Sequence, residues 1–239
     1  FDGAKTISYD DGVADGRINY IPQSVIDSYL DEVSKQGIHT DLVKSSGLKV
    51  VYTPLNGTGN KPVRAILKKI GVEDVTVVPE QEYPDGNFPT CPFPNPEIKE
   101  ALAKGLELCN VVKPDLLLAT DPDCDRVGIA VPSDNGYELF TGNEVGAMLL
   151  EYICSERTKM GTMPADPVAV KTIVTTDIAA KIAKEYGVKL IEVLTGFKFI
   201  GEQIGFLEDK GQEDRYIFGF EESYGYLAGS YVTVSYTHL

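Results

Sequence analysis

The sequence predicts an α/β protein with two consecutive three-layer α/β/α domains and mainly parallel sheets. Three observations lead to this prediction: short apolar runs alternate with helical patterns, turn-rich segments separate them, and the pattern occurs twice in series along 239 residues. Strands that alternate with helices usually pair in parallel, because a crossover helix returns the chain to the same edge of the sheet. A chain of this length can bury one or two cores.

The first 40 residues are polar and predict a linker with one helix, at residues 24–33, rather than a core. The first α/β unit follows. Residues 79–96 are rich in proline and glycine and predict a long loop. The helix after this loop has a proline in its expected first turn. The predicted strands and helices of this unit are strand 48–52, helix 63–70, strand 75–78, helix 96–110, strand 115–119 and strand 127–131.

The second α/β unit repeats the alternation of strands and helices after a loop at residues 158–167. A boundary between the two units is expected between residues 142 and 167, where one pattern ends and the next begins. The predicted elements are helix 143–156, strand 168–172, helix 178–186, strand 189–193, helix 197–207 and strand 216–220.

The composition excludes several classes of function. A net charge of −14 argues against nucleic-acid and anionic-membrane partners, because no basic surface offsets it. No apolar run approaches the roughly 20 residues of a membrane span, and the first residues lack the pattern of a signal peptide. The four cysteines form no C-x-x-C pair, which predicts free thiols and a cytoplasmic location.

The strongest chemical signal is an acidic loop, Thr120-Asp-Pro-Asp-Cys-Asp-Arg126, directly after a predicted buried strand. Ligand sites in open α/β sheets lie at the carboxyl ends of strands. In extended chain, carboxylates at alternate positions point the same way, so Asp121, Asp123 and Asp125 should converge. Their mutual repulsion would be relieved by Mg²⁺, which prefers hard oxygen ligands. Arg126 is positioned to bind a phosphate beside the metal.

Other interpretations of this loop remain open. It could be a solvated acidic turn, or the nucleophile loop of an aspartyl-phosphate phosphatase with Asp121 as the attacking carboxylate. An EF-hand is rejected, because its required glycine and glutamate positions hold Arg126 and Pro132. A dinucleotide-binding loop at Gly57-Thr-Gly59 is also rejected, because Pro62 occupies the place of the third glycine; a tight strand-to-helix turn is expected instead.

The loop resembles the D-P-D-x-D-R metal signature of the α-D-phosphohexomutase family. Four more segments support the resemblance, which runs from about residue 41 to residue 232. Gly219-Phe-Glu-Glu-Ser-Tyr-Gly225 resembles the sugar-binding loop of the family, in the form found in phosphoglucomutases and phosphopentomutases, and Thr195-Gly-Phe-Lys198 resembles its T-G-x-K segment. The two remaining segments resemble parts of the second domain of the family: Tyr52-Thr-Pro-Leu-Asn-Gly-Thr-Gly59 and Phe88-Pro-Thr-Cys-Pro-Phe-Pro-Asn-Pro96.

The resemblance implies a domain assignment. Residues 1–40 would be a remnant of the first domain with a linker, 41–142 the metal-binding second domain, and 143–239 the truncated sugar-binding third domain. The catalytic phosphoserine of the family lies in the first domain and a phosphate clamp in the fourth, and neither motif occurs here. We therefore expect the chain alone to be inactive. Residues 233–239 depart from the family pattern, so a truncation followed by a non-native tail is expected.

The resemblance also implies an activity and a set of site residues. The activity is a phosphoglucomutase-type exchange between sugar 1-phosphate and 6-phosphate, through a phosphoserine and a sugar 1,6-bisphosphate, with Mg²⁺ as cofactor. Phosphopentomutase and phosphomannomutase activities, and a non-catalytic sugar-phosphate binding module, remain alternatives. The predicted partners are the sugar phosphate and the first and fourth domains. The predicted substrate-binding residues are Arg126, Thr195, Gly196, Glu221 and Ser223, with Lys171 and Lys198 as weaker candidates, and none is assigned as the general base.

Overall fold

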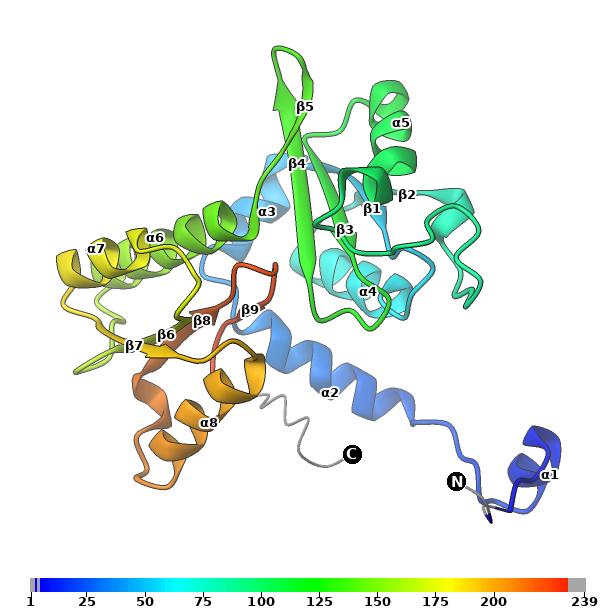
Figure 1. The fold of residues 1–239 in the computed structure, drawn as a ribbon, viewed down its shortest axis with the longest axis horizontal. Helices are drawn as coiled ribbons and strands as arrows, with labels where there is room; N and C mark the ends of the chain where they lie inside the picture. The colour runs from blue at the N-terminus through cyan, green and yellow to red at the C-terminus, as the bar shows by residue number, and fades with distance from the viewer. Residues whose placement is uncertain (1–2, 4, 232–239) are drawn as a thin grey trace.

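The computed structural model describes residue 3 and residues 5–231, so the tail predicted at residues 233–239 lies outside the described residues. The described chain forms two α/β domains, each built around its own sheet (Figure 1). The predicted fold class of two three-layer α/β/α domains is confirmed, although both sheets are mixed. Among the described residues, no helix combines the length and apolar character that crossing a membrane requires.

The first domain contains a five-stranded sheet in the order β2-β1-β3-β4-β5. The first three strands in this order are parallel, and β4 and β5 are antiparallel to their neighbours. The loop between β3 and β4 is too short for a crossover, so β4 must run back beside β3. The strands are β1 (Lys49–Thr53), β2 (Asp74–Val77), β3 (Leu116–Thr120), β4 (Val127–Ser133) and β5 (Gly136–Leu139).

Helices cover both faces of this sheet. Helix α5 (Ala103–Val112) packs on one face through a cluster that includes Leu102, Cys109 and Leu117. On the other face, α4 (Asn60–Ile70) and α3 (Thr40–Ser46) cover Val50 and Tyr52. Each core side chain of this size contributes about 1.5–3 kcal/mol by leaving water.

The second domain has the sheet order β7-β6-β8-β9, with β9 antiparallel to β8. Helices α6 and α7 pack on one face around Leu150, Ala179 and Phe218, and α8 packs on the other around Ile200 and Ile204. The elements are α6 (Gly142–Met160), β6 (Val168–Thr172), α7 (Ile178–Glu185), β7 (Lys189–Val193), α8 (Phe197–Glu208), η3 (Glu213–Arg215), β8 (Tyr216–Phe220) and β9 (Tyr226–Leu227).

The helix expected at residues 96–110 is the main local error of the sequence analysis. The chain instead forms a short 3-10 turn, η2 (Lys99–Leu102), and only then α5. The side-chain oxygen of Asn95 accepts a hydrogen bond from Glu97 N, and Asn95 O accepts one from Ile98 N. This local turn uses the amide groups that would have begun the helix.

The N-terminal segment holds more structure than the single helix expected. It contains α1 (Tyr9–Ala14) and α2 (Gln23–Ser34), with α3 leading into β1. Figure 1 shows α1 at the end of an arm, from which α2 leads back to the body of the molecule. Another 3-10 turn, η1 (Pro79–Gln81), begins the long predicted loop. The α2 and α4 helices are tied by an ion pair between Lys69 and Asp31.

Candidate functional site

The acidic loop lies at the carboxyl end of β3 and joins it to the antiparallel β4. Asp121 is buried, whereas Asp123 and Asp125 are exposed, and one carboxylate oxygen from each residue lies within 4.8 Å of those of the other two. Two oxygens bound to the same Mg²⁺ lie at most about 4.2 Å apart, twice the Mg–O distance. Small side-chain rotations would therefore bring all three oxygens to one ion.

The electrostatics of the loop also suit a cation. The pKa of Asp121 is raised to about 7. Burial is the largest cause, a hydrogen bond from Arg126 N opposes it, and the neighbouring Asp123 and Asp125 add to the rise. That amide donates to Asp121 Oδ1 over 2.9 Å. A buried carboxylate among like charges is stabilised when a positive ion shares the site. The donor set of three hard oxygens, two of them open to solvent, fits Mg²⁺ with water or phosphate completing its shell.

The turn after β1 contacts the acidic loop and holds its backbone in place. Thr58 donates from its backbone N and its hydroxyl to Pro122 O, over 2.8 and 3.1 Å. A Cβ on Gly57 would lie 2.3 Å from Pro122 Cα, so only glycine allows this close approach. The buried Tyr52 hydroxyl shares a hydrogen bond of 2.8 Å with the Thr120 hydroxyl at the start of the loop. The predicted strand-to-helix turn is therefore present, and it positions the acidic residues.

The Glu221–Gly225 loop occupies the equivalent place in the second domain, between β8 and the antiparallel β9. Glu221 is buried, and its Oε1 accepts a hydrogen bond of 2.6 Å from Gly196 N. Ser223 Oγ donates to Glu221 Oε2 over 3.4 Å. Burial raises the pKa of Glu221, and the hydrogen bond from Gly196 opposes that effect. A carboxylate and a hydroxyl in contact can serve two neighbouring hydroxyl groups of a ligand.

The two loops meet across one cavity. It is lined by residues of both domains and has a volume of 210 Å³. The backbone N of Val127 donates to Tyr224 O over 3.0 Å, which links the end of the acidic loop directly to the second loop. The lining residues are Asp125, Arg126, Gly196, Phe197, Glu221, Ser223 and Gly225.

The arginine of the acidic loop is held beside the cavity. Its Nη1 donates to Glu97 Oε1 over 3.2 Å, and its Nε lies 4.0 Å from Asp121 Oδ2 and 3.9 Å from Asp125 Oδ1. A half-buried guanidinium in this position can pair with a phosphate while Glu97 fixes its orientation.

Not every predicted site residue reaches this cavity. Thr195 is exposed beside Gly196 but is absent from the lining. The Lys198 ammonium lies 4.7 Å from the centroid of the Phe199 ring, on the surface. Lys171 is fully buried, and its Nζ donates to Thr175 O over 3.0 Å. The structure gives these three residues no place in the cavity lining.

Sequence reasoning did not single out Phe197, Gly225 or Glu97. A Cβ on Gly225 would lie 2.0 Å from the Phe197 ring, so this glycine lets the loop close over the start of α8. The glycine that ends the E-E-S-Y-G run was visible in the sequence and could have indicated this close approach. Glu97, in contrast, lies 29 residues from Arg126 in the chain, and no local pattern connects the two.

Comparisons with known proteins cover both domains. The family model described as phosphoglucomutase/phosphomannomutase, alpha/beta/alpha domain II, matches residues 27–135, and the model of domain III matches residues 141–235. A phosphoglucomutase of Staphylococcus aureus (strain N315) is 36% identical over 216 residues, which are 90% of this chain and 37% of that protein. The chain thus spans a little over a third of the length of this curated relative.

Solved structures show the same fold. A phosphoglucomutase/phosphomannomutase family protein of Burkholderia thailandensis superposes with a TM-score of 0.61 at 18% identity, over 83% of this chain and 39% of that chain. An N-acetylphosphoglucosamine mutase of Aspergillus fumigatus, solved in complex with glucose 1,6-bisphosphate, gives a TM-score of 0.51 at 16% identity, over 80% of this chain and 35% of that chain.

Proposed function

Because the chain belongs to the phosphoglucomutase/phosphomannomutase family, we propose that it forms the central part of a phosphoglucomutase-type enzyme. The proposed reaction interconverts sugar 1-phosphate and sugar 6-phosphate by way of a phosphoserine and a sugar bisphosphate. The phosphoserine domain and the phosphate-clamp domain are proposed partners of the chain. The single observation that carries the proposal is the shared cavity, in which the acidic loop of one domain faces the Glu221–Ser223 pair of the other.

In this proposal Asp121, Asp123 and Asp125 hold Mg²⁺. Bound there, the ion would neutralise negative charge on the phosphoryl group being transferred. Arg126, fixed by Glu97, orients that group from the side of the cavity. The chain contributes binding and orientation, and the phosphoryl carrier comes from elsewhere in the enzyme.

Glu221 and Ser223 bind the sugar hydroxyls in the proposal. The Glu221 carboxylate accepts hydrogen bonds from the sugar, whereas the Ser223 hydroxyl both donates and accepts. A mutase must hold its sugar in two orientations, with either phosphate towards the carrier. A compact pair of groups that recognises neighbouring hydroxyls meets this requirement, because it does not depend on which end of the sugar carries the phosphate.

Glucose phosphates are the proposed substrates, since the curated relative described above is named a phosphoglucomutase. Ribose and mannose phosphates are the alternatives, as substrates of phosphopentomutases and phosphomannomutases. The cytoplasmic location, the domain boundaries and the Mg²⁺ cofactor stay predictions. A comparison of the affinities of glucose, mannose and ribose 1-phosphates for the chain would rank the substrates.

Isothermal titration of the chain with glucose 1-phosphate in Mg²⁺ tests the proposal. Binding should be lost or strongly weakened in Glu221→Ala and Ser223→Ala, and unchanged in Glu208→Ala, an exposed glutamate at the end of α8. A coupled assay for glucose 6-phosphate should show no turnover by the chain alone. Absence of binding by the unaltered chain, or binding indifferent to Glu221, would overturn the proposed site.

The phosphatase alternative is tested in the same preparation. An aspartyl-phosphate phosphatase would release inorganic phosphate from p-nitrophenyl phosphate, and Asp121→Asn would abolish that release. The mutase proposal expects no release from the unaltered chain.

A further inference from the structure

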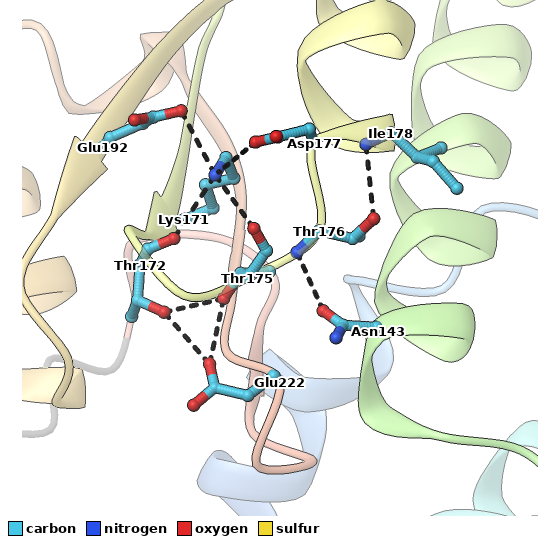
Figure 2. Close-up of polar contacts among 9 residues, drawn as sticks. All are labelled: Asn143, Lys171, Thr172, Thr175, Thr176, Asp177, Ile178, Glu192 and Glu222. Atoms are coloured by element: carbon cyan, nitrogen blue, oxygen red, sulfur yellow. Dashed lines mark hydrogen bonds and ion pairs between the residues drawn. The ribbon is translucent and has the colours of Figure 1, made fainter.

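The Glu221–Gly225 loop, called the sugar loop below, carries two adjacent glutamates whose side chains point to different parts of the second domain. Glu221 lines the cavity and accepts from Gly196 N. Glu222 does not line it; its Oε2 accepts hydrogen bonds from the hydroxyls of Thr172 and Thr175, each over 3.1 Å (Figure 2). Glu222 therefore connects the sugar loop to the segment between β6 and α7.

The two threonine hydroxyls are buried and lie 2.7 Å apart. Each hydroxyl carries one proton, so at most two of the three contacts among these groups are hydrogen bonds at once. Either both threonines donate to Glu222, or one donates to the other, which donates to Glu222. The Glu222 carboxylate supplies an acceptor that both can reach. Hydrogen bonds to a charged acceptor are stronger than bonds between neutral groups, so the Glu222 side chain is held firmly in this position.

The segment that holds Glu222 is itself fixed to strands β6 and β7 and to helix α6. The buried Lys171 Nζ donates to Thr175 O and forms an ion pair of 3.1 Å with Glu192 on β7. Asn143 Oδ1, on α6, accepts a hydrogen bond of 2.9 Å from Thr176 N. Figure 2 shows these contacts converging on the turn after β6. These contacts restrain the turn, and so they restrain the Glu222 side chain that it binds.

The backbone of Glu222 is also confined. A Cβ placed on Gly142, at the start of α6, would lie 2.1 Å from Glu222 O, so α6 presses against the peptide of the sugar loop. Its side chain is hydrogen-bonded and its carbonyl lies in close contact with α6, so Glu222 restrains the loop between Glu221 and Ser223, the two residues that reach the cavity.

We propose that Glu222, held by Thr172 and Thr175, is a positioning residue that sets the orientation of Glu221 and Ser223 towards the sugar hydroxyls. The inference rests on the proposed function for its link to sugar binding. It assigns a role to the second glutamate of the loop and to two buried threonines that do not line the cavity.

Two measurements on the full 239-residue chain test the inference. The first is the affinity for glucose 1-phosphate in Mg²⁺. We expect Glu222→Ala, and the double variant Thr172→Val with Thr175→Val, to weaken binding about tenfold, as is typical when a hydrogen bond to a charged group is lost. Glu222→Gln, whose amide oxygen can still accept from both hydroxyls, should restore most of the affinity. Combining Glu222→Ala with both valines should add little, because all three changes break the same contact.

The second measurement needs no ligand. The amide proton of Gly196 bonds to Glu221, so its NMR shift and exchange rate report the position of that carboxylate. Both should change in Glu222→Ala and stay close to the unaltered values in Glu222→Gln. Asp177→Asn is the matched control. It removes a negative charge from the same turn, where Asp177 pairs with Lys171 and does not contact Glu222. If Glu222→Ala does not fold, Thr175→Val replaces it in both measurements, because it removes one of the two hydroxyls that contact Glu222.

The outcomes separate the two proposals. If glucose 1-phosphate binds and both measurements give the same result in Glu222→Ala as in Asp177→Asn, the positioning role is wrong while the proposed function stands. If the unaltered chain binds no sugar phosphate but the Gly196 amide responds to Glu222→Ala and not to Asp177→Asn, the proposed function fails and the positioning of Glu221 is supported.

Discussion

Asp123 is the most direct residue-scale test of the metal site. It is exposed, and its carboxylate contributes one of the three clustered oxygens. We expect Asp123→Asn to lower the affinity for Mg²⁺ or Mn²⁺ at least as much as outer-shell changes do, about 10–100-fold. Titration of Mn²⁺, followed by electron paramagnetic resonance, measures the effect.

The control for this prediction is Asp134→Asn. Asp134 is an exposed aspartate in the turn between β4 and β5. The acidic loop precedes β4, and Asp134 follows its other end. It carries the same charge but lies outside the acidic cluster. Equal affinities in the unaltered chain and in Asp123→Asn would show that the three aspartates do not share an ion.

Residue types and spacing were enough to predict the clustering of the acidic side chains. Asp121, Asp123 and Asp125 do converge, but not in the extended chain that was expected. Cys124 N donates a hydrogen bond of 3.1 Å to Asp121 O and Cys124 has a φ of 65°, so a turn brings the three carboxylates together. The same reasoning could not tell that Lys171 is buried, since a lysine in a strand can point to solvent, to a ligand or to the interior. Burial of its ammonium depends on Glu192, which lies on the neighbouring strand β7, and on Asp177 in the turn that follows β6.

At the scale of elements, α6 begins with a complete capping box. The Thr141 hydroxyl accepts from Glu144 N, and the Glu144 carboxylate accepts from Thr141 N. Thr141→Ala should destabilise the chain by about 1 kcal/mol, the usual cost of losing a cap. Urea unfolding monitored by circular dichroism measures this difference. Thr158→Ala, near the other end of the helix and exposed, should leave stability nearly unchanged.

Two buried thiols predict a pH dependence. Burial raises the pKa of Cys109, on α5, and of Cys154, on α6, to about 11, against 9.0 as the ordinary value. In the folded state these groups keep protons that the unfolded chain loses. Stability should therefore fall as pH rises from about 9 towards 11, and be unaffected by these thiols below that range.

Iodoacetamide labelling of the native chain, read by mass spectrometry, checks the thiol prediction. Only the thiolate reacts, so labelling of Cys109 and Cys154 at pH 8 should be far slower than after unfolding, and should accelerate with each unit of pH. Rapid labelling of either residue in the folded chain at pH 8 would contradict the burial described above.

The two strands that the sequence did not predict share a physical feature. Strands β5 and β9 are four and two residues long, and each exists by pairing antiparallel to a neighbour. Such short segments carry no periodic pattern of their own, so their formation depends on tertiary pairing. Pro62, which argued against a dinucleotide-binding loop, lies in the first turn of α4, where its missing N–H has no helical partner to lose.

At the scale of the whole molecule, the close contact between the start of α6 and the sugar loop sets the position of that loop. A Cβ on Gly142 would lie 2.1 Å from Glu222 O and 2.8 Å from Tyr224 N. Gly142→Ala should push the loop away from its place, weaken binding of glucose 1-phosphate, and destabilise the chain by about 1–3 kcal/mol. Calorimetric titration and thermal unfolding measure the two effects.

Gly205→Ala is the matched control for this substitution. Gly205 lies inside α8, and a Cβ on it would meet nothing within 4 Å, so alanine there should stabilise the helix slightly. If Gly142→Ala bound glucose 1-phosphate as tightly as Gly205→Ala, the spacing of the sugar loop would not depend on α6.

The bond from Val127 N to Tyr224 O is made by main-chain atoms alone. Any amino acid except proline at position 127 keeps that donor, so the width of the gap between the halves is insulated from ordinary substitution there. Sequence drift at position 127 can therefore proceed without changing the distance between the two loops that border the cavity.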